Sequence, residues 1–161
     1  MLLAELYDNK DADIDWNWHG DAYYGTFTVG EQEYMVQMRK IIANSMIYKQ
    51  FKPAPPVTDN TWYYAFAPTD PITHQPVNTR FPTDRPIELI SKVINIAVKY
   101  IQDNNVDVLY YGGDKSDPVR IRVYEMITKK MTSRYGWEFA GEGDANFMGV
   151  TSHFYYIKKP E

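Results

Sequence analysis

Four aspartates near the start of the chain are the first residues whose types and spacing suggest chemistry. They are Asp8, Asp11, Asp13 and Asp15. Acidic runs of this kind occur in calcium-binding loops, which also need a glycine at the turn and a bidentate glutamate at the twelfth position. Here Trp16 stands at the glycine position, and Ala22 stands at the glutamate position counted from Asp11. We therefore interpret the run as the solvated face of a strand.

Metal and thiol chemistry find little support in the rest of the sequence. His19, His74 and His153 lie far apart and show no His-x-x-x-His spacing, so only folding could assemble a zinc site from them. The chain contains no cysteine, which excludes a thiolate nucleophile, a thiolate metal ligand and a disulfide. We expect no metal.

Two further motifs resemble catalytic signatures but are incomplete. Gly112 and Gly113 are followed by Asp114, and no Lys-Ser or Lys-Thr pair follows at the distance that a phosphate-binding loop requires. Ser116 and Ser133 lack the flanking glycines of a nucleophile elbow. The sequence thus favours neither a nucleotide hydrolase nor a serine hydrolase.

Tyrosine is the unusual residue type, with 14 copies in the chain. Eight of them form adjacent pairs within strand-like runs: Tyr23-Tyr24, Tyr63-Tyr64, Tyr110-Tyr111 and Tyr155-Tyr156. Neighbours in a strand point to opposite faces, so each pair places one ring on each side of a sheet. The rings either serve as strand formers with polar tips or form a stacking surface for a ligand or partner. In the second interpretation, Tyr63 and Tyr111 mark the binding surface.

Length, composition and charge limit the remaining possibilities. A chain of 161 residues with 44% hydrophobic and 24% charged residues is typical of one globular domain, spanning residues 1–161. The net charge of -4 argues against a general affinity for nucleic acid. The first residues have no basic region followed by an apolar run, and no segment reaches the length of a membrane span. We expect a cytoplasmic protein that does not bind membranes.

The elements that must position these residues begin with an antiparallel meander. Residues 13–18 alternate polar and apolar side chains, residues 22–29 follow, and a turn at Gly30 leads into residues 33–39. Residues 62–67 are predicted to form the next strand, after a proline-containing connection. Residues 68–82 then form a long loop, and loops of this length are often functional or mobile.

The second half of the chain alternates helices and strands. Thr83 or Asp84 is predicted to cap a helix that ends near Asn104. Its buried stripe is predicted to consist of Ile87, Ile90, Val93, Ile94, Ala97 and Ile101. A buried strand follows at residues 106–111, and the Gly112-Gly113 pair is predicted to end it. Strand, helix and strand in this order predict a right-handed parallel crossover.

A second helix and a hairpin complete the predicted order. Asp117 suits the N-cap, Pro118 the first helical position and Gly136 the C-terminal stop. The buried residues of this helix are predicted to be Ile121, Tyr124, Ile127 and Met131. Residues 137–140, a glycine turn at 141–143 and a strand from 147 to 157 are predicted to form the hairpin.

This order of elements resembles the GNAT superfamily of N-acetyltransferases, and more narrowly the small GNAT-like proteins encoded by bacteriophages. The resemblance spans most of the chain from about Asp13 onward. It is carried by residues 32–36, 62–66 and 93–101, and above all by Asp114, Ser116, Asp117, Arg120 and Tyr124. It implies an α+β fold with a mixed sheet: an antiparallel meander, then strand, helix, parallel strand, helix and terminal hairpin.

The resemblance also implies a place for acetyl-coenzyme A. In the active superfamily this cofactor lies where the two central parallel strands splay apart, with its pyrophosphate on a glycine-rich turn that opens the first helix. The corresponding residues here, 78–86, contain no glycine, and two prolines each remove an amide donor. Arg80, Thr83 and Arg85 are the candidate cofactor contacts, with the arginines as phosphate ligands. The competing interpretation is that both arginines are solvated charges.

Tyr124 is the one candidate catalytic residue. It lies on the helix where many of these acetyltransferases carry a tyrosine that protonates the departing thiolate, which requires its hydroxyl to reach the strand splay. The competing interpretation is a ring packed in the core, because Tyr124 shares a stripe with Ile121 and Ile127. Arg120 and Arg122 are expected to pair with nearby carboxylates.

Three functions follow as expectations. The leading one is a GNAT-like, phage-encoded domain that binds a host or phage protein or a small ligand and makes no ordinary use of acetyl-coenzyme A. The second is an active N-acyltransferase with Tyr124 as general acid. The third is a structural or virion-associated protein that assembles through a sheet edge.

Overall fold

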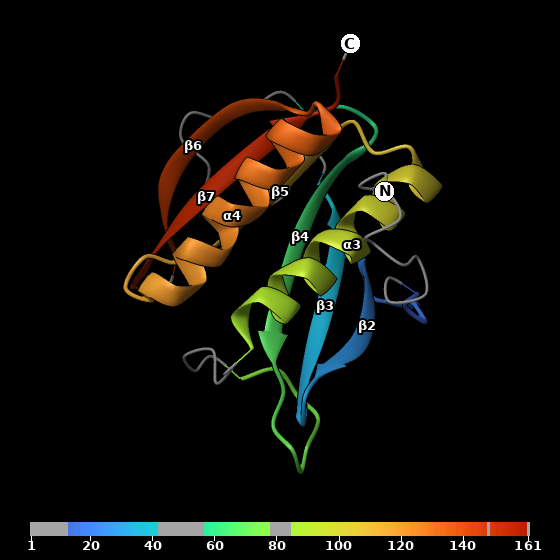
Figure 1. Ribbon diagram of the computed structural model, residues 1–161, viewed down its shortest axis with the longest axis vertical. Helices are drawn as coiled ribbons and strands as arrows, with labels where there is room; N and C mark the ends of the chain where they lie inside the picture. Colours follow the sequence, from blue (N-terminus) through green and yellow to red (C-terminus); the bar gives the residue numbers. More distant parts are fainter. Residues whose placement is uncertain (1–12, 42–56, 78–84, 148, 161) are drawn as a thin grey trace.

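The structure is a computed structural model that describes residues 13–41, 57–77, 85–147 and 149–160 (Figure 1). Its described residues form a seven-stranded mixed sheet in the order β1-β2-β3-β4-β5-β7-β6. The strands are β1 (Asn17–His19), β2 (Ala22–Val29), β3 (Gln32–Lys40), β4 (Thr61–Pro68), β5 (Val108–Asp114), β6 (Glu138–Phe147) and β7 (Val150–Lys158). The helices α3 (Pro86–Asn104) and α4 (Pro118–Tyr135) cover the same face of this sheet (Figure 1).

The first four strands form the predicted antiparallel meander. β2 and β3 pair from Ala22 with Arg39 to Val29 with Gln32, around a turn in which Gly30 adopts a φ of 62°. Along β3, the alternate residues Tyr34, Val36 and Met38 are fully buried, as their two-residue period predicted. The first strand is shorter than predicted, because only Asn17–His19 pair with β2.

The crossover joins the two halves of the sheet. β4 runs into α3, and α3 returns to β5, which pairs with β4 in parallel from Thr61 with Val108 to Tyr64 with Tyr111. β5 then pairs with β7, and β7 pairs with β6 as an antiparallel terminal hairpin. This is the order of elements that the resemblance to the GNAT superfamily implied, so the predicted fold class is confirmed.

Helix α3 begins later than predicted. Its N-cap residue is Arg85, and no side-chain hydrogen bond caps the helix in the part of the chain that the structure describes. The N-cap thus follows the predicted Thr83 or Asp84, both of which lie outside the described ranges. The prediction that Ile87 belongs to the buried stripe is wrong, because Ile87 is 76% exposed. The stripe starts at Leu89 and Ile90, where the helix first packs on the sheet.

Helix α4 has both of its predicted ends. The carboxylate of Asp117 accepts a hydrogen bond from the backbone amide of Arg120 at 3.2 Å, and Pro118 occupies the first turn. At the other end, Gly136 has a left-handed φ of 71° and its amide bonds the carbonyl of Met131. Tyr124, Ile127 and Met131 are buried against the sheet, and Ile121 is half-buried.

The Gly112-Gly113 pair does not end its strand, which corrects the prediction. β5 continues through both glycines to Asp114, and both remain paired with β7. A Cβ atom on Gly112 would lie 2.4 Å from the carbonyl oxygen of His153. A Cβ atom on Gly113 would lie 2.5 Å from Cδ of Arg120. The glycines therefore allow a close approach of neighbouring groups, which is a second role of glycine in strands.

The terminal hairpin is longer than predicted. The predicted glycine turn at residues 141–143 is wrong, because Gly141 and Gly143 lie inside β6 and pair with β7. A register shift between Phe139 and Gly141 accommodates the ring of Tyr156, whose hydroxyl lies over Gly141. The chain reverses instead between Phe147 and Val150, where Gly149 has a φ of 81°.

The tyrosine pairs divide between the two faces of the sheet, as predicted. On the helix side, Tyr64, Tyr111 and Tyr155 belong to the main core, with Tyr23 packed against it. On the opposite side, Tyr110 and Tyr156 form a second, smaller cluster with Ile41 and Val108, with Tyr63 packed against it. The sheet is thus lined by tyrosine rings on both faces. Among the described residues, no helix is both long enough and apolar enough to cross a lipid bilayer.

Candidate functional site

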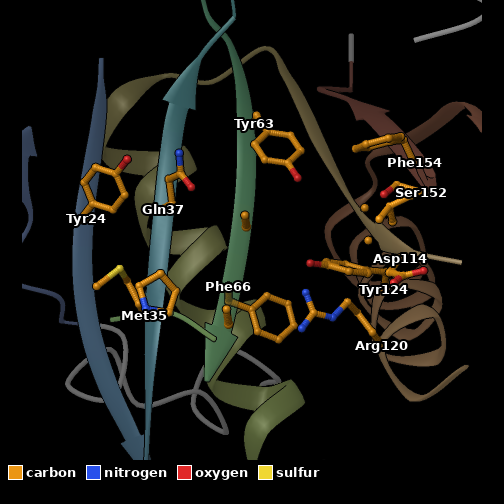
Figure 2. A pocket seen from close by; sticks show the side chains of 16 residues that line it. Tyr24, Met35, Gln37, Tyr63, Phe66, Asp114, Arg120, Tyr124, Ser152 and Phe154 are labelled. Carbon is orange, nitrogen blue, oxygen red and sulfur yellow. The ribbon is translucent and has the colours of Figure 1, made fainter. Parts of the chain in front are cut away.

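A pocket lies where β4 and β5 separate. Their pairing ends at Tyr64 and Tyr111, whereas β4 continues to Pro68 and β5 continues to Asp114. The pocket has a volume of about 400 Å³, within the range of small-molecule sites. Figure 2 shows side chains from β2 and β3 on one side of it and side chains from α4 and β7 on the other. The structure therefore places a cavity at the strand splay, where the resemblance located the site.

Tyr124 has features of both interpretations, because its ring is packed in the core and its hydroxyl faces the pocket. Its ring is 1% exposed and packs between Phe66 and Tyr111, with ring centroids 5.4 Å and 5.7 Å away. Its hydroxyl end points across the gap toward β4 (Figure 2), and the residue lines the pocket. Burial raises the pKa of Tyr124, and the nearby Tyr63 raises it further. The hydroxyl is therefore a neutral hydrogen-bond donor at physiological pH.

Arg120 is the cationic side chain of the pocket. It comes from the first turn of α4 and is 9% exposed. Its Nε atom lies 3.6 Å from the Oδ2 atom of Asp117, which confirms that this arginine pairs with a local carboxylate. Its guanidinium group points into the splay and faces the ring of Phe66 (Figure 2). A buried guanidinium at this position brings positive charge to the wall of the cavity.

Gly113 has no side chain and so leaves the space that the side chains of Arg120 and Tyr124 occupy. A Cβ atom on Gly113 would lie 2.5 Å from Cδ of Arg120 and 3.1 Å from Cε2 of Tyr124. Both side chains cross the backbone of β5 at this point, and only a residue without a side chain leaves them room. The sequence alone does not indicate this role, because a glycine pair after an apolar run also predicts the end of a strand.

Tyr63 and Tyr111, which were predicted to form a binding surface, differ in their exposure. Tyr63 is half-buried and lines the pocket, with its hydroxyl directed into the gap (Figure 2). Tyr111 is fully buried, and its hydroxyl is 2.6 Å from Oγ1 of Thr128 on α4. The prediction of Tyr111 as a contact surface is wrong, because its strand position turns it toward the helices. Phe154, which contacts Tyr63, and Tyr24 on β2 also line the pocket, and the prediction did not include them.

Of the three predicted cofactor contacts, only Arg85 lies within the described residues. Arg80 and Thr83 lie outside the described residues. The Nη1 atom of Arg85 lies 3.5 Å from Oε2 of Glu88, and the guanidinium lies close to Gly30 in the turn between β2 and β3. Glu88 is thus an acidic residue in the first turn of α3, where an anionic ligand would otherwise meet the positive end of the helix.

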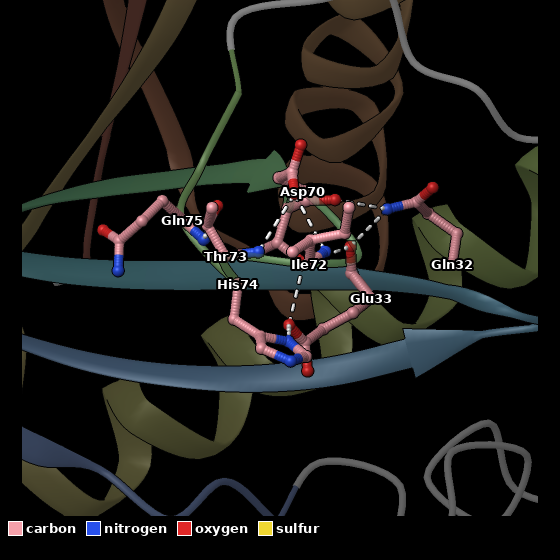
Figure 3. Close-up of polar contacts among 8 residues, drawn as sticks. Gln32, Glu33, Asp70, Ile72, Thr73, His74 and Gln75 are labelled. Carbon is pink, nitrogen blue, oxygen red and sulfur yellow. Dashed lines mark hydrogen bonds and ion pairs between the residues drawn. The ribbon is translucent and has the colours of Figure 1, made fainter.

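The loop that leaves β4 borders the pocket through Pro76. It closes on itself by a bridge between Thr69 and Pro76, and the carboxylate of Asp70 accepts bonds from the amides of Ile72 and Thr73. Oε1 of Glu33 accepts from the hydroxyl of Thr69 at 2.8 Å and lies 3.0 Å from Nδ1 of His74 (Figure 3). These bonds lower the pKa of Glu33 and fasten the loop to β3.

The histidines do not come together. His74 contacts Glu33, whereas His153 lies between Asp144 and Glu142 on the hairpin. Within the described ranges, no group of three or more histidine, aspartate or glutamate side chains is arranged to hold a metal ion. Asp8 and Asp11 lie outside those ranges.

Comparisons with known proteins place few constraints on function. No protein-family model matches the chain, and no curated protein matches it. Among solved structures, the chain is similar to an N-acetyltransferase from Staphylococcus aureus Mu50, with 10% sequence identity and a TM-score of 0.47. The match covers 85% of this chain and 67% of the other. The function of this chain is therefore inferred from its own residues.

Proposed function

We propose that this protein is a binding domain that holds a small organic ligand in the pocket between β4 and β5, without ordinary use of acetyl-coenzyme A. The observation that carries this proposal is the pocket itself, where neutral phenols, a buried guanidinium and aromatic rings line one cavity of about 400 Å³. Apolar walls with a few convergent polar groups are the usual composition of a ligand site.

The acid-base properties of the lining residues favour binding over catalysis. A general acid works best when its pKa lies near the operating pH, and a thiolate leaving group has a pKa of about 8.5. Burial instead raises the pKa of Tyr124 above its ordinary value of 10.0. The carboxylate of Asp114 has a lowered pKa, because the side chain and backbone amide of Ser116 donate hydrogen bonds to it, so it is a weak base for an amine. These two side chains suit hydrogen bonding better than proton transfer.

The entrance to helix α3 also favours a ligand other than acetyl-coenzyme A. Pro86 contributes no amide donor in the first turn, and Glu88 adds a negative charge there. Residues 78–86 contain no glycine that would let a pyrophosphate approach the backbone. A cofactor held mainly through its pyrophosphate would therefore gain little from this end of the helix.

Calorimetric titration tests the proposal directly. We expect no binding of acetyl-coenzyme A at micromolar concentrations, and binding of small aromatic ligands that is lost when Ala65→Trp fills the pocket. Ala65 is half-buried in the pocket wall, whereas Glu138→Trp, at an exposed position of β6 outside the pocket, is the matched control. If a wide panel of small ligands bound the two variants equally well, the site would lie elsewhere and the proposal would fail.

An active N-acyltransferase is the second candidate, because the hydroxyl of Tyr124 points into the splay. This candidate predicts micromolar binding of acetyl-coenzyme A and acetylation of at least one amine in a panel. It also predicts that Tyr124→Phe lowers the turnover number, because the variant keeps the ring and removes only the hydroxyl. Acetyl-coenzyme A that failed to bind at millimolar concentration would exclude it.

A further inference from the structure

We propose that the ligand carries an oxyanion, in the form of a carboxylate, and that this group sits where the side chains of Tyr63, Arg120 and Tyr124 converge. The inference rests on the proposed function and names the chemical class of its ligand. Tyr63 comes from β4, whereas Arg120 and Tyr124 come from α4, so the three groups approach the cavity from both sides of the strand splay (Figure 2).

The three side chains form a set of hydrogen-bond donors. Burial raises the pKa of both Tyr63 and Tyr124, so both hydroxyls keep their protons at physiological pH and can donate. The guanidinium of Arg120 is a planar donor that matches the two oxygens of a carboxylate. Two phenols and one guanidinium therefore present donors to the same small volume, which suits an acceptor-only group.

Arg120 brings a positive charge close to both phenols. Arg120 and Arg39 act on the Tyr63 hydroxyl, and both lower its pKa against the larger effect of burial. At Tyr124, burial, Tyr63 and Asp117 raise the pKa, whereas Arg120 lowers it. Arg120 would therefore attract an anion placed between these hydroxyls, and this attraction offsets part of the cost of burying the anion's charge.

The two carboxylates near the pocket are committed to other bonds. The Oδ1 atom of Asp114 accepts from the amide and hydroxyl of Ser116 at 2.9 Å and 2.7 Å, and the carboxylate points away from the splay (Figure 2). The Oδ1 atom of Asp117 caps α4 through the amide of Arg120. Neither group therefore occupies the space between the phenols.

The rest of the cavity suits an aromatic body. The rings of Tyr63 and Phe154 line the side of the pocket that faces away from the helices, and Tyr24 and Met35 line it from β2 and β3 (Figure 2). Tyr63 and Phe154 lie 6.3 Å apart at an interplanar angle of 54°, so a ring can pack against one or both. An aryl carboxylate is therefore the ligand class that fits both ends of the pocket.

Paired calorimetric titrations with benzoate and benzamide test this inference, because the two probes share a shape and differ in charge. We expect benzoate to bind about tenfold to a hundredfold more tightly than benzamide, the difference that charge-assisted hydrogen bonds provide. Arg120→Gln should remove this preference. Arg122→Gln, an exposed position on the same helix, should retain it.

The variants Tyr63→Phe and Tyr124→Phe supply a second test that does not depend on the folding of Arg120→Gln. Each keeps its ring and should weaken benzoate binding about fivefold to twentyfold, with less effect on benzamide. Equal binding of benzoate and benzamide to the natural protein would overturn the oxyanion assignment while leaving the pocket as a ligand site. Absence of binding by either probe up to about 10 mM, where even weak sites are occupied, would overturn this inference, and the Ala65→Trp comparison would then decide the proposed function separately.

Discussion

Tyr64 connects the sheet to helix α3 through one hydroxyl group. The ring is fully buried on the helix side of β4, and its hydroxyl donates a hydrogen bond to the carbonyl of Val93 at 2.9 Å. Burial raises the pKa of this hydroxyl, so it remains a donor at physiological pH. The bond helps to place α3 against the first half of the sheet.

Replacing Tyr64 with phenylalanine should therefore lower the free energy of unfolding by about 1 kcal/mol, the usual net value of one buried hydrogen bond. Urea denaturation monitored by circular dichroism measures this loss. The control is Tyr23→Phe, whose half-buried ring contacts Trp18 and Trp62 and which should change stability by less. Equal losses in the two variants would show that the bond to Val93 is not stabilising.

The candidate site could be predicted from the sequence only in part. The position of Tyr124 on α4 followed from helical spacing, and the N-cap of Asp117 followed from residue type. The convergence of Tyr63 with Arg120 could not be read in this way, because the two residues are 57 positions apart and meet only through the pairing of β4 with β5.

At the scale of elements, the two adjacent glycines of β5 have different neighbours. A Cβ atom on Gly112 would meet the backbone of β7, with the His153 oxygen at 2.4 Å and Cα of Phe154 at 2.8 Å. A Cβ atom on Gly113 would meet the side chains of Arg120 and Tyr124 instead. Backbone atoms in a sheet cannot move aside without breaking pairs, whereas the arginine chain can change rotamer.

We therefore expect Gly112→Ala to lower the melting temperature by several degrees, because a loss of about 2 kcal/mol has that effect in a domain of this size. Gly113→Ala should retain more stability but lose most of the ligand affinity, since the added methyl group displaces Arg120 from the pocket. Scanning calorimetry and the benzoate titration measure the two effects. If Gly113→Ala bound benzoate normally, the positioning role of this glycine would be excluded.

The hairpin of β6 and β7 carries a titratable link. Nδ1 of His153 lies 2.5 Å from Oδ1 of Asp144, and Nε2 lies 2.8 Å from Oε2 of Glu142. Partial burial opposes the charge on His153, but the bonds to the two carboxylates outweigh it and raise its pKa above the ordinary 6.5. The side chain of Lys115 adds a bond to Asp144 at 2.7 Å.

This link should make the stability of the hairpin depend on pH. Because the folded pKa of His153 is raised, its contribution is fully present below the unfolded pKa of 6.5 and is lost as the pH rises through the folded value. His153→Gln should therefore lower the melting temperature more at about pH 5.5 than at about pH 8.5. His19→Gln, on the exposed strand β1, is the control. A pH-independent difference between His153→Gln and the natural protein would contradict the prediction.

At the scale of the whole molecule, the negative net charge argues against binding to nucleic acid. The chain has 21 acidic and 17 basic residues and a net charge of -4. Binding to nucleic acid draws its non-specific affinity from contacts between basic residues and phosphates. We expect no binding to a labelled DNA duplex at about 0.15 M salt in fluorescence anisotropy. Micromolar binding would reveal a basic patch whose local charge outweighs the net charge.

The two halves of the sheet join at the short parallel pairing of β4 with β5, and the two helices cover the same face on either side of this junction (Figure 1). Trp62 and Leu109 form a buried pair across this junction. Because the pairing stops at Tyr64 and Tyr111, the remaining length of both strands becomes the walls of the pocket. The same arrangement that joins the halves thus creates the site.

The sequence by itself determined the order of the described elements, because strand alternation, helical stripes, Asp117 and Gly136 are local signals that depend on neighbouring residues. The resemblance of this order to a known superfamily then implied the fold class. The sequence did not determine the ends of the elements around Gly112 and Gly141, because glycine marks both a break in a strand and a close approach within one. Only the tertiary structure decided that Gly112 and Gly113 lie inside β5, and that Arg120 and Tyr124 pass over Gly113 into the pocket. The physical reason is that these contacts join residues far apart in the chain, and their existence depends on strand pairing and helix packing together.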